Sequence, residues 1–311
     1  MSVAFSSGFA SHIEAMLEWR AGLGYAQTLV YPMQSFDRFC TAHRPGETFV
    51  SRELVTAWCE EGARVQWPAY KAHAIREFGK YLKMVDIDAF VLPAEWINQP
   101  ARSLPHIFTD EELTTFFLAA DSFTACPASP FREYTIPVVF RLMLGCGLRP
   151  QEARRLHRRD VDLDKAIVLI EQTKRNKDRR VPIDAGMAAL LARFDQLANL
   201  HRPGRKFFFE HHPGQPYRGR WLTASYHQCR AMAGDLAPGS TPYTLRHNYA
   251  TRTLMRWVEE GRDLNVWLPY LSAYMGHETY SATAYYIHLL PERLSATGLT
   301  GMAGIIPEVT R

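Results

Sequence analysis

The spacing between a histidine and a tyrosine near the carboxyl end limits how this part of the chain can fold. His277 follows Gly276 directly, and Tyr286 lies nine residues after His277. On one straight helix the two residues would be about 13 Å apart, because each residue advances the helix by about 1.5 Å. If both side chains belong to one site, the chain must turn between them. The alternative interpretation is a pair of helices whose tyrosines pack into a core.

Basic residues recur in three short motifs upstream of this stretch. Arg149 follows the glycine-rich run Gly145–Leu148, and Glu152 lies three residues further on. Lys174 precedes a basic turn, and Arg246 lies near a predicted helix start. An arginine guanidinium binds phosphate through two parallel hydrogen bonds and stays charged, which a lysine cannot copy. Each of these arginines could bind a phosphate in this way or could only form a surface salt bridge.

In order and spacing, these residues resemble those of the tyrosine recombinase, or phage integrase, family, over roughly residues 106 to 290. The resemblance implies an enzyme that cuts and rejoins DNA strands through a 3′-phosphotyrosyl intermediate. It implies two phosphate-binding arginines, a general-acid lysine, a phosphate-binding histidine and a tyrosine nucleophile. The implied arginines are Arg149 and Arg246, and the implied general acid is Lys174. The implied phosphate-binding histidine is His277, and the implied nucleophile is Tyr286. Lys177 and Tyr285 are the neighbouring alternatives for the lysine and the tyrosine.

One position departs from the family pattern. Tyr243 stands where the family usually has a histidine that accepts a proton and binds the phosphate. A phenol whose pKa is near 10 is a poor base at neutral pH. We expect Tyr243 to hydrogen-bond the phosphate, or proton removal to be shared by water and His277. Glu152 is expected to orient an arginine, unless it only forms a structural ion pair, and His247 is expected to support the site.

Positive charge is concentrated in one part of the chain. Residues 1–105 carry 10 Lys and Arg against 11 Asp and Glu, whereas residues 149–180 carry 11 basic and 6 acidic residues. Such a basic surface favours a polyanion such as DNA, although a charged run is often only a solvated face. The predicted DNA contacts are Arg76, Lys80 and Lys83 on a helix from about Ala69 to Met84, and Arg175, Lys177, Arg179 and Arg180 on a hairpin.

Hydrophobic periodicity predicts a mainly α-helical protein with two domains. Residues 1–92 form the expected small helical domain, which in the family clamps DNA, and three prolines mark residues 93–105 as a linker. Residues 106–311 are the expected catalytic domain, mostly helical with one small antiparallel β-sheet and a C-terminal tail. The predicted strands are Val161–Gln172 and Arg180–Ile183, and Thr109–Glu112 is a predicted capping box.

The remaining features concern location, cofactors and partners. The five cysteines include no Cys-x-x-Cys pair, and no run approaches 18 apolar residues, so we expect a cytoplasmic, nucleoid-associated protein without a membrane segment. His211 and His212 lack the spacing of a zinc motif, and no metal or other cofactor is expected. Expected partners are double-stranded recombination sites, a homotetramer on synapsed DNA, and accessory DNA-bending proteins or sister recombinases. A DNA-binding regulator with a degenerate site and a type IB topoisomerase stay open as alternatives.

Overall fold

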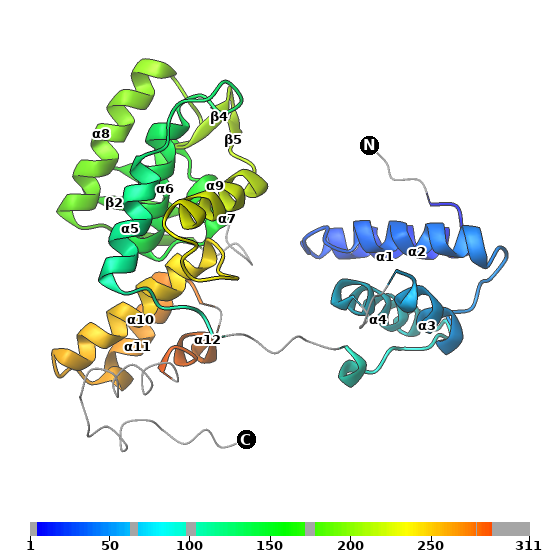
Figure 1. Ribbon diagram of the computed structural model, residues 1–311. Helices are drawn as coiled ribbons and strands as arrows, with labels where there is room; N and C mark the ends of the chain where they lie inside the picture. The colour runs from blue at the N-terminus through cyan, green and yellow to red at the C-terminus, as the bar shows by residue number, and fades with distance from the viewer. Residues whose placement is uncertain (1–4, 63–67, 98–103, 172–177, 278, 288–311) are drawn as a thin grey trace. The chain divides into compact units, whose positions relative to one another are not determined.

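The computed structural model describes residues 5–62, 68–97, 104–171, 178–277 and 279–287. The chain divides into two compact units, Met1–Ser103 and Leu104–Arg311 (Figure 1). The division falls within the proline-rich segment 93–105. Each unit contains a hydrophobic core of its own, so the two are described separately.

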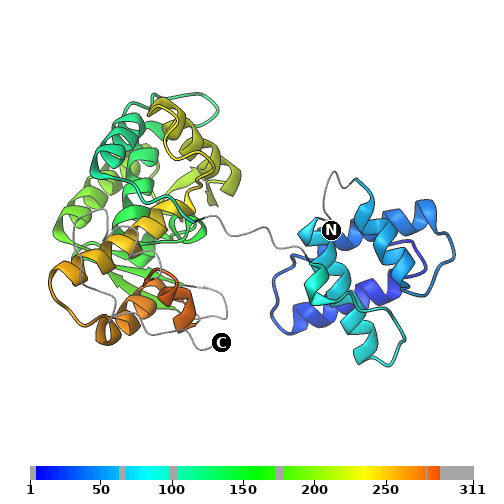
Figure 2. The ribbon, with the colours of Figure 1, turned by 60° about the horizontal axis from the view of Figure 1, so that its bottom comes forward.

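The described part of the amino-terminal unit contains four α-helices (Figure 2). They are α1 (Ala10–Gly22), α2 (Val30–His43), α3 (Arg52–Glu60) and α4 (Ala69–Met84), followed by the 3-10 turn η1 (Ala94–Trp96). Aromatic side chains are prominent in the core between the helices. The ring of Phe36 lies 5.2 Å from that of Trp58 and 6.1 Å from that of Phe78. On α4, Phe78 is buried whereas Lys80 and Lys83 are exposed, so this helix is amphipathic as predicted.

The described part of the carboxyl-terminal unit consists mainly of helices, together with two small antiparallel sheets. The helices are α5 (Asp110–Asp121), α6 (Arg132–Cys146), α7 (Pro150–Arg154), η2 (Arg158–Asp160), α8 (Ala185–His201), α9 (Gly219–Met232), α10 (Tyr243–Glu259), α11 (Leu264–Met275) and α12 (Tyr280–Ala284). The strands are β1 (Val161–Asp162), β2 (Ile167–Ile170), β3 (Arg179–Pro182), β4 (Glu210–His212) and β5 (Gln215–Pro216). The mainly α fold with a small antiparallel sheet is therefore confirmed.

Local sequence explains where these elements begin and end. The predicted capping box is present, since Thr109 accepts from the Glu112 amide and Glu112 accepts from the Thr109 amide at the start of α5. The strand predicted over Val161–Gln172 is instead two strands, β1 and β2. A turn separates them because the Lys165 amide donates to the carboxylate of Asp162 at 3.0 Å. The predicted hairpin turn after β2 lies outside the described residues.

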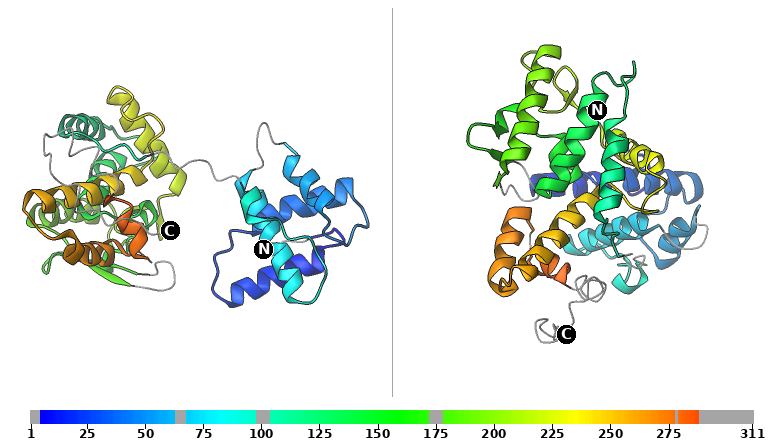
Figure 3. Two further views of the ribbon diagram at one scale, coloured as in Figure 1. Left: turned by 90° about the horizontal axis from the view of Figure 1, so that it is seen from below. Right: turned by 60° about the vertical axis from the view of Figure 1, so that its left-hand side comes forward.

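Helices α6, α10 and α11 carry the segments that meet at the candidate site. Helix α10 packs against α6 and α11, and α11 also contacts α12 and β3 (Figure 3). Helix α6 ends at Gly147, whose φ of +61° is the left-handed conformation that ends many helices. A side chain at this glycine would collide with the ring of Tyr249. Among the described residues, no helix has the length and apolar character needed to cross a membrane.

Candidate active site

Three of the predicted site residues lie at the start of α10. Arg246 and His247 follow Tyr243 by three and four residues, a spacing that puts all three on one side of the helix. Tyr243 is 37% exposed, whereas Arg246 is fully buried. The rings of Tyr243 and His247 have centroids 5.2 Å apart, and Tyr243 also interacts electrostatically with Arg149.

The end of α11 turns the chain back toward α10. Gly276 has a φ of +64°, and a side chain there would also press on Arg179. The five-residue helix α12 follows and contacts α11. As a result, the rings of His277 and Tyr286 stack at 18° with centroids 6.1 Å apart. The chain thus turns between these two residues, and both side chains belong to one cluster.

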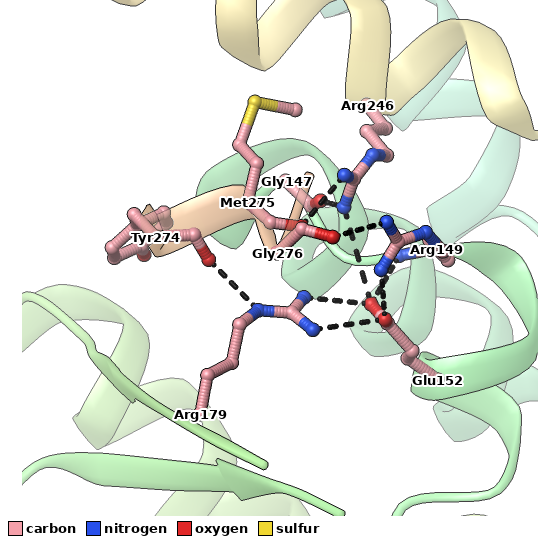
Figure 4. Close-up of polar contacts among 8 residues, drawn as sticks. All are labelled: Gly147, Arg149, Glu152, Arg179, Arg246, Tyr274, Met275 and Gly276. Carbon is pink, nitrogen blue, oxygen red and sulfur yellow. Dashed lines mark hydrogen bonds and ion pairs between the residues drawn. The ribbon is translucent and has the colours of Figure 1, made fainter. Parts of the chain in front are cut away.

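Glu152 joins two arginines from different elements (Figure 4). Its carboxylate accepts hydrogen bonds from both terminal nitrogens of Arg179, at 2.9 and 2.8 Å, and from Nη1 of Arg149 at 2.6 Å. Nη2 of Arg149 donates to the carbonyl of Gly276 at 2.5 Å. Burial disfavours the charged carboxylate, but Arg179 and Arg149 outweigh this effect and lower the pKa of Glu152 to about 2. The carboxylate therefore stays ionised at neutral pH.

Arg179 lies inside this network, which departs from its predicted place on a DNA-contacting surface. Its side chain is 9% exposed, and its Nε donates to the carbonyl of Tyr274 at 2.8 Å while both terminal nitrogens bind Glu152. Successive side chains of a strand point to opposite faces. Arg179 consequently shares the inner side of β3 with the buried Val181, and its neighbour Arg180 is exposed.

Main-chain carbonyls hold Arg246. Its Nη1 donates to the carbonyl of Gly147 at 2.6 Å, and its Nη2 donates to that of Met275 at 2.7 Å (Figure 4). The arginine thereby links the ends of α6 and α11. Burial and the charge of Arg149 lower the pKa of Arg246 to about 10, so it remains a cation at neutral pH. Its Nε is buried without a hydrogen-bond partner among the described residues.

The Tyr286 hydroxyl lies against a histidine. Tyr286 is 2% exposed, and its oxygen is 2.9 Å from Nδ1 of His247. Burial raises the pKa of Tyr286 to about 12, although Arg246 acts in the opposite direction. Burial, followed by the charge of Arg246, lowers the pKa of His247 to about 4. His247 is therefore neutral at pH 7, and its unprotonated nitrogen can accept the phenolic hydrogen.

His277 is fixed by a threonine that no sequence motif marked. Nδ1 of His277 lies 2.6 Å from Oγ1 of Thr283, a fully buried side chain. Burial, with smaller effects from Arg246 and Arg149, lowers the pKa of His277 to about 3. Thr283 lies six residues beyond His277, across the turn into α12, so helical spacing does not pair them.

The structure describes only some of the remaining predicted residues of this unit. Lys174, Arg175 and Lys177 belong to the segment 172–177, which lies outside the described residues. Arg180 is exposed on β3. Tyr285 is half-buried, with its ring centroid 5.6 Å from that of Tyr286. Of these two adjacent tyrosines, Tyr286 is the one whose hydroxyl contacts His247.

On α4 the three predicted DNA-contacting cations have intramolecular partners. Arg76 donates to the carbonyl of Leu92 and is half-buried. The exposed Lys80 pairs with Glu77 at 2.8 Å, and the exposed Lys83 pairs with Asp88. Because exposed ion pairs are worth about 1 kcal/mol or less, both lysines remain available to a phosphate.

In the part of the chain that the structure describes, one group of side chains has the proximity of metal ligands: His157, Asp160 and Glu171. Arg159 already pairs with both carboxylates, at 3.4 Å from Asp160 and 3.1 Å from Glu171. Arg159 therefore offsets part of the negative charge of this group, which is distinct from the cluster around Tyr286.

Residues 108–293 match the model of the phage integrase family. This match spans more than half of the chain, so the protein belongs to that family of tyrosine recombinases, enzymes that cleave and rejoin DNA strands. The integrase/recombinase y4rE of Sinorhizobium fredii is 29% identical over 293 residues, which cover 91% of this chain and 93% of that protein. Tyrosine recombinase XerC of Nitrobacter winogradskyi is 34% identical over 157 residues, covering 50% of this chain and 46% of that protein.

Two solved structures share the fold. XerH site-specific recombinase bound to its difH substrate matches with a TM-score of 0.63 at 18% identity, over 88% of this chain and 78% of that one. The Tn1549 transposon integrase in complex with transposon right end DNA also matches with a TM-score of 0.63, at 13% identity, over 92% of this chain and 99% of that one. At these identities the likeness concerns the fold alone.

Proposed function

We propose that this protein is a site-specific recombinase or integrase of a mobile element, which cuts a DNA strand with Tyr286 and rejoins it to a partner strand. The observation that carries this proposal is the Tyr286 hydroxyl, which lies 2.9 Å from His247. It is also close enough to Arg246 and Arg149 for both charges to oppose the burial that raises its pKa. A phenol is a weak nucleophile at neutral pH. It therefore needs cations on the phosphate and a proton acceptor, and the cluster contains both.

Arg149 and Arg246 are the proposed ligands of the nonbridging phosphate oxygens. The Arg149 side chain is 27% exposed, and a charged phosphate oxygen can replace its contact to the Gly276 carbonyl, because hydrogen bonds to ionised acceptors are stronger. A phosphate oxygen also offers an acceptor to the Nε of Arg246. Cations already in place stabilise the charge that develops at phosphorus in the transition state.

The proposed reaction conserves bond energy. The Tyr286 oxygen forms a bond to phosphorus as the bond to the 5′ oxygen breaks, which leaves the strand attached as a 3′-phosphotyrosyl ester. Lys174 is the proposed general acid for the leaving 5′ oxygen, and His277 the proposed hydrogen-bond donor to the phosphate. Attack by the 5′ hydroxyl of the partner strand reverses these steps. The scheme consumes no ATP and requires no metal.

Double-stranded DNA is the proposed partner, and both recombinases named above for their fold were solved with DNA. The exposed Lys80, Lys83 and Arg180 are the described cations that we assign to the DNA backbone, together with Arg175 and Lys177. Strand exchange between two duplexes requires four strand cuts, so we assign four copies to a pair of sites. Such a protein would act on the nucleoid in the cytoplasm.

The test is formation of a covalent adduct. Nicked duplexes tiled across the DNA that flanks the coding sequence would be incubated with the full chain, and adducts resolved on denaturing gels. We expect wild type to form an adduct with the duplexes that carry its site and Tyr286→Phe to form none while still binding DNA. Tyr285→Phe is the matched control and should retain the adduct. An adduct that persists in Tyr286→Phe and vanishes in Tyr285→Phe would overturn the assignment.

Tyr243 favours a second candidate, a DNA-binding regulator whose site no longer cuts, because the usual histidine is missing there. That candidate predicts sequence-specific binding with no adduct on any tiled duplex.

A relaxing topoisomerase would instead form the adduct on a single site and change the linking number of a plasmid without joining two sites.

A further inference from the structure

We propose that His247 is a catalytic residue, the base that takes the proton from Tyr286, in place of the histidine that Tyr243 replaces. This inference rests on the proposed function and assigns one proton transfer within it. Tyr286 is almost fully buried, so its hydroxyl has little access to bulk water. Nδ1 of His247 lies within hydrogen-bonding distance of that hydroxyl, at 2.9 Å.

The other candidate bases are less well placed. His277 has its Nδ1 committed to Thr283 at 2.6 Å. Its ring is nearly parallel to that of Tyr286, with centroids 6.1 Å apart, and the hydroxyl of Tyr286 contacts His247. The committed Nδ1 leaves Nε2 of His277 for the phosphate. Tyr243 is a phenol like the nucleophile itself, and a neutral phenol is a poor base at neutral pH. The two histidines therefore have different roles: His247 accepts the proton of Tyr286, and His277 donates a hydrogen bond to the phosphate.

The charges around His247 make the base dependent on the substrate. The groups that face it are Arg246 and Tyr243 on α10, His277 beyond α11, and Tyr286 beyond α12. Without DNA, burial and Arg246 keep the imidazole neutral and a poor proton acceptor. A bound phosphate diester adds negative charge to the cluster, which favours the imidazolium. Tyr286 is thus activated only when a phosphate lies between the arginines.

The step balances as follows. The O–H bond of Tyr286 breaks and its proton passes to Nδ1 of His247, while the phenolic oxygen forms its bond to phosphorus. The bond from phosphorus to the 5′ oxygen breaks, and that oxygen takes a proton from Lys174. In the rejoining step His247 returns its proton to Tyr286 as the phosphotyrosyl bond breaks.

The test uses the full chain and the tiled duplex that wild type converts to adduct. His247→Asn keeps a polar group near the Tyr286 hydroxyl but cannot take up a proton at neutral pH. We expect its single-turnover cleavage to fall on the order of 10²- to 10⁴-fold, the usual range for a general base, with DNA affinity unchanged. Cleavage by His247→Asn within about threefold of wild type, with wild-type affinity, would overturn the proposal.

Two further measurements exclude a merely structural role. The double variant Tyr243→His with His247→Asn should cleave at least about tenfold faster than His247→Asn alone, because a histidine again faces the nucleophile. The cleavage rate of wild type should rise with pH through one ionisation and then level off. The cleavage rate of His247→Asn should not show this rise. Identical pH profiles, or no recovery in the double variant, would contradict the proposal. Absence of any adduct in wild type would instead reject the proposed function itself.

Discussion

Glu152 receives more of the polar contacts of the site than any other single residue in Figure 4. It binds Arg179 and Arg149 through its side chain, accepts from the Arg149 amide at 2.8 Å, and lies 4.0 Å from Arg246. One buried carboxylate thus hydrogen-bonds two guanidinium groups and lies at ion-pair distance from a third. Removing one partner of such a buried pair costs more than forming it contributes, because it leaves an uncompensated charge.

The lowered pKa of Glu152 makes the stability of the protein sensitive to acid. Its folded-state pKa of about 2 lies below the ordinary glutamate value of 4.5, so its contribution to stability is complete above pH 4.5 and is lost as the pH falls toward 2. The shift corresponds to about 3 kcal/mol of unfolding free energy. We expect urea unfolding to show this loss between those pH values. The lowered pKa values of His247 and His277 act in the same direction, starting near pH 6.5.

Glu152→Gln separates the carboxylate from the histidines. The variant should have a lower unfolding free energy than wild type at pH 7. It should also lack the part of the acid-induced loss of unfolding free energy that occurs between pH 4.5 and 2. Glu259→Gln, an exposed carboxylate at the end of α10, is the control and should change stability by less than about 0.5 kcal/mol. Equal acid profiles for wild type and Glu152→Gln would show that the ion pair is not responsible.

At the scale of elements, strand β3 carries two adjacent arginines with different surroundings. Arg179 points inward to Glu152 and Arg180 points outward. We expect Arg179→Gln to lower the unfolding free energy by about 3–5 kcal/mol, because it leaves the buried Glu152 without its main partner. Arg180→Gln should leave stability within about 0.5 kcal/mol and weaken DNA binding. Equal losses of stability in the two variants, measured by urea unfolding, would contradict this division.

Local patterns predicted these elements better than they predicted the contacts between them. Periodicity and capping located α4 and the start of α5, because both depend on neighbours within one or two turns. The alternation that makes Val181 buried could also have placed Arg179 inward, but the charge of Arg179 suggested a surface contact instead. The partners of Arg179 and Tyr286 lie 27 and 39 residues away, and no local rule links residues at such distances. Thr283 escaped notice because its separation of six residues from His277 matches no helical spacing.

At the scale of the whole molecule, the amino-terminal unit carries exposed lysines on α4 that we propose contact the DNA backbone. Of the three cations predicted on α4, Lys80 and Lys83 are exposed and Arg76 is half-buried against the carbonyl of Leu92. We expect Lys80→Ala with Lys83→Ala to weaken binding to all DNA sequences alike, because phosphate contacts position a protein without reading bases. Two lost contacts correspond to about 1.8 in the log–log slope of affinity against salt.

The control for these lysines is a pair of exposed cations elsewhere in the same unit. Arg38→Ala with Arg44→Ala should leave the salt slope within experimental error of wild type. An unchanged slope in the lysine variant would assign the outer face of α4 to solvent. A loss of adduct without a loss of binding would place the lysines in catalysis, against the proposal.

The central claim is that Tyr286 becomes the covalent link between protein and DNA, and peptide mapping of the adduct tests it most directly. The trapped complex would be digested with nuclease and trypsin, and the nucleotide-bearing peptide fragmented in a mass spectrometer. The account predicts a 3′-phosphonucleotide on Tyr286, within the tryptic peptide that runs from Asp263 to Arg293. A nucleotide on Tyr285, Tyr280 or any other residue, or a 5′ linkage, would contradict it.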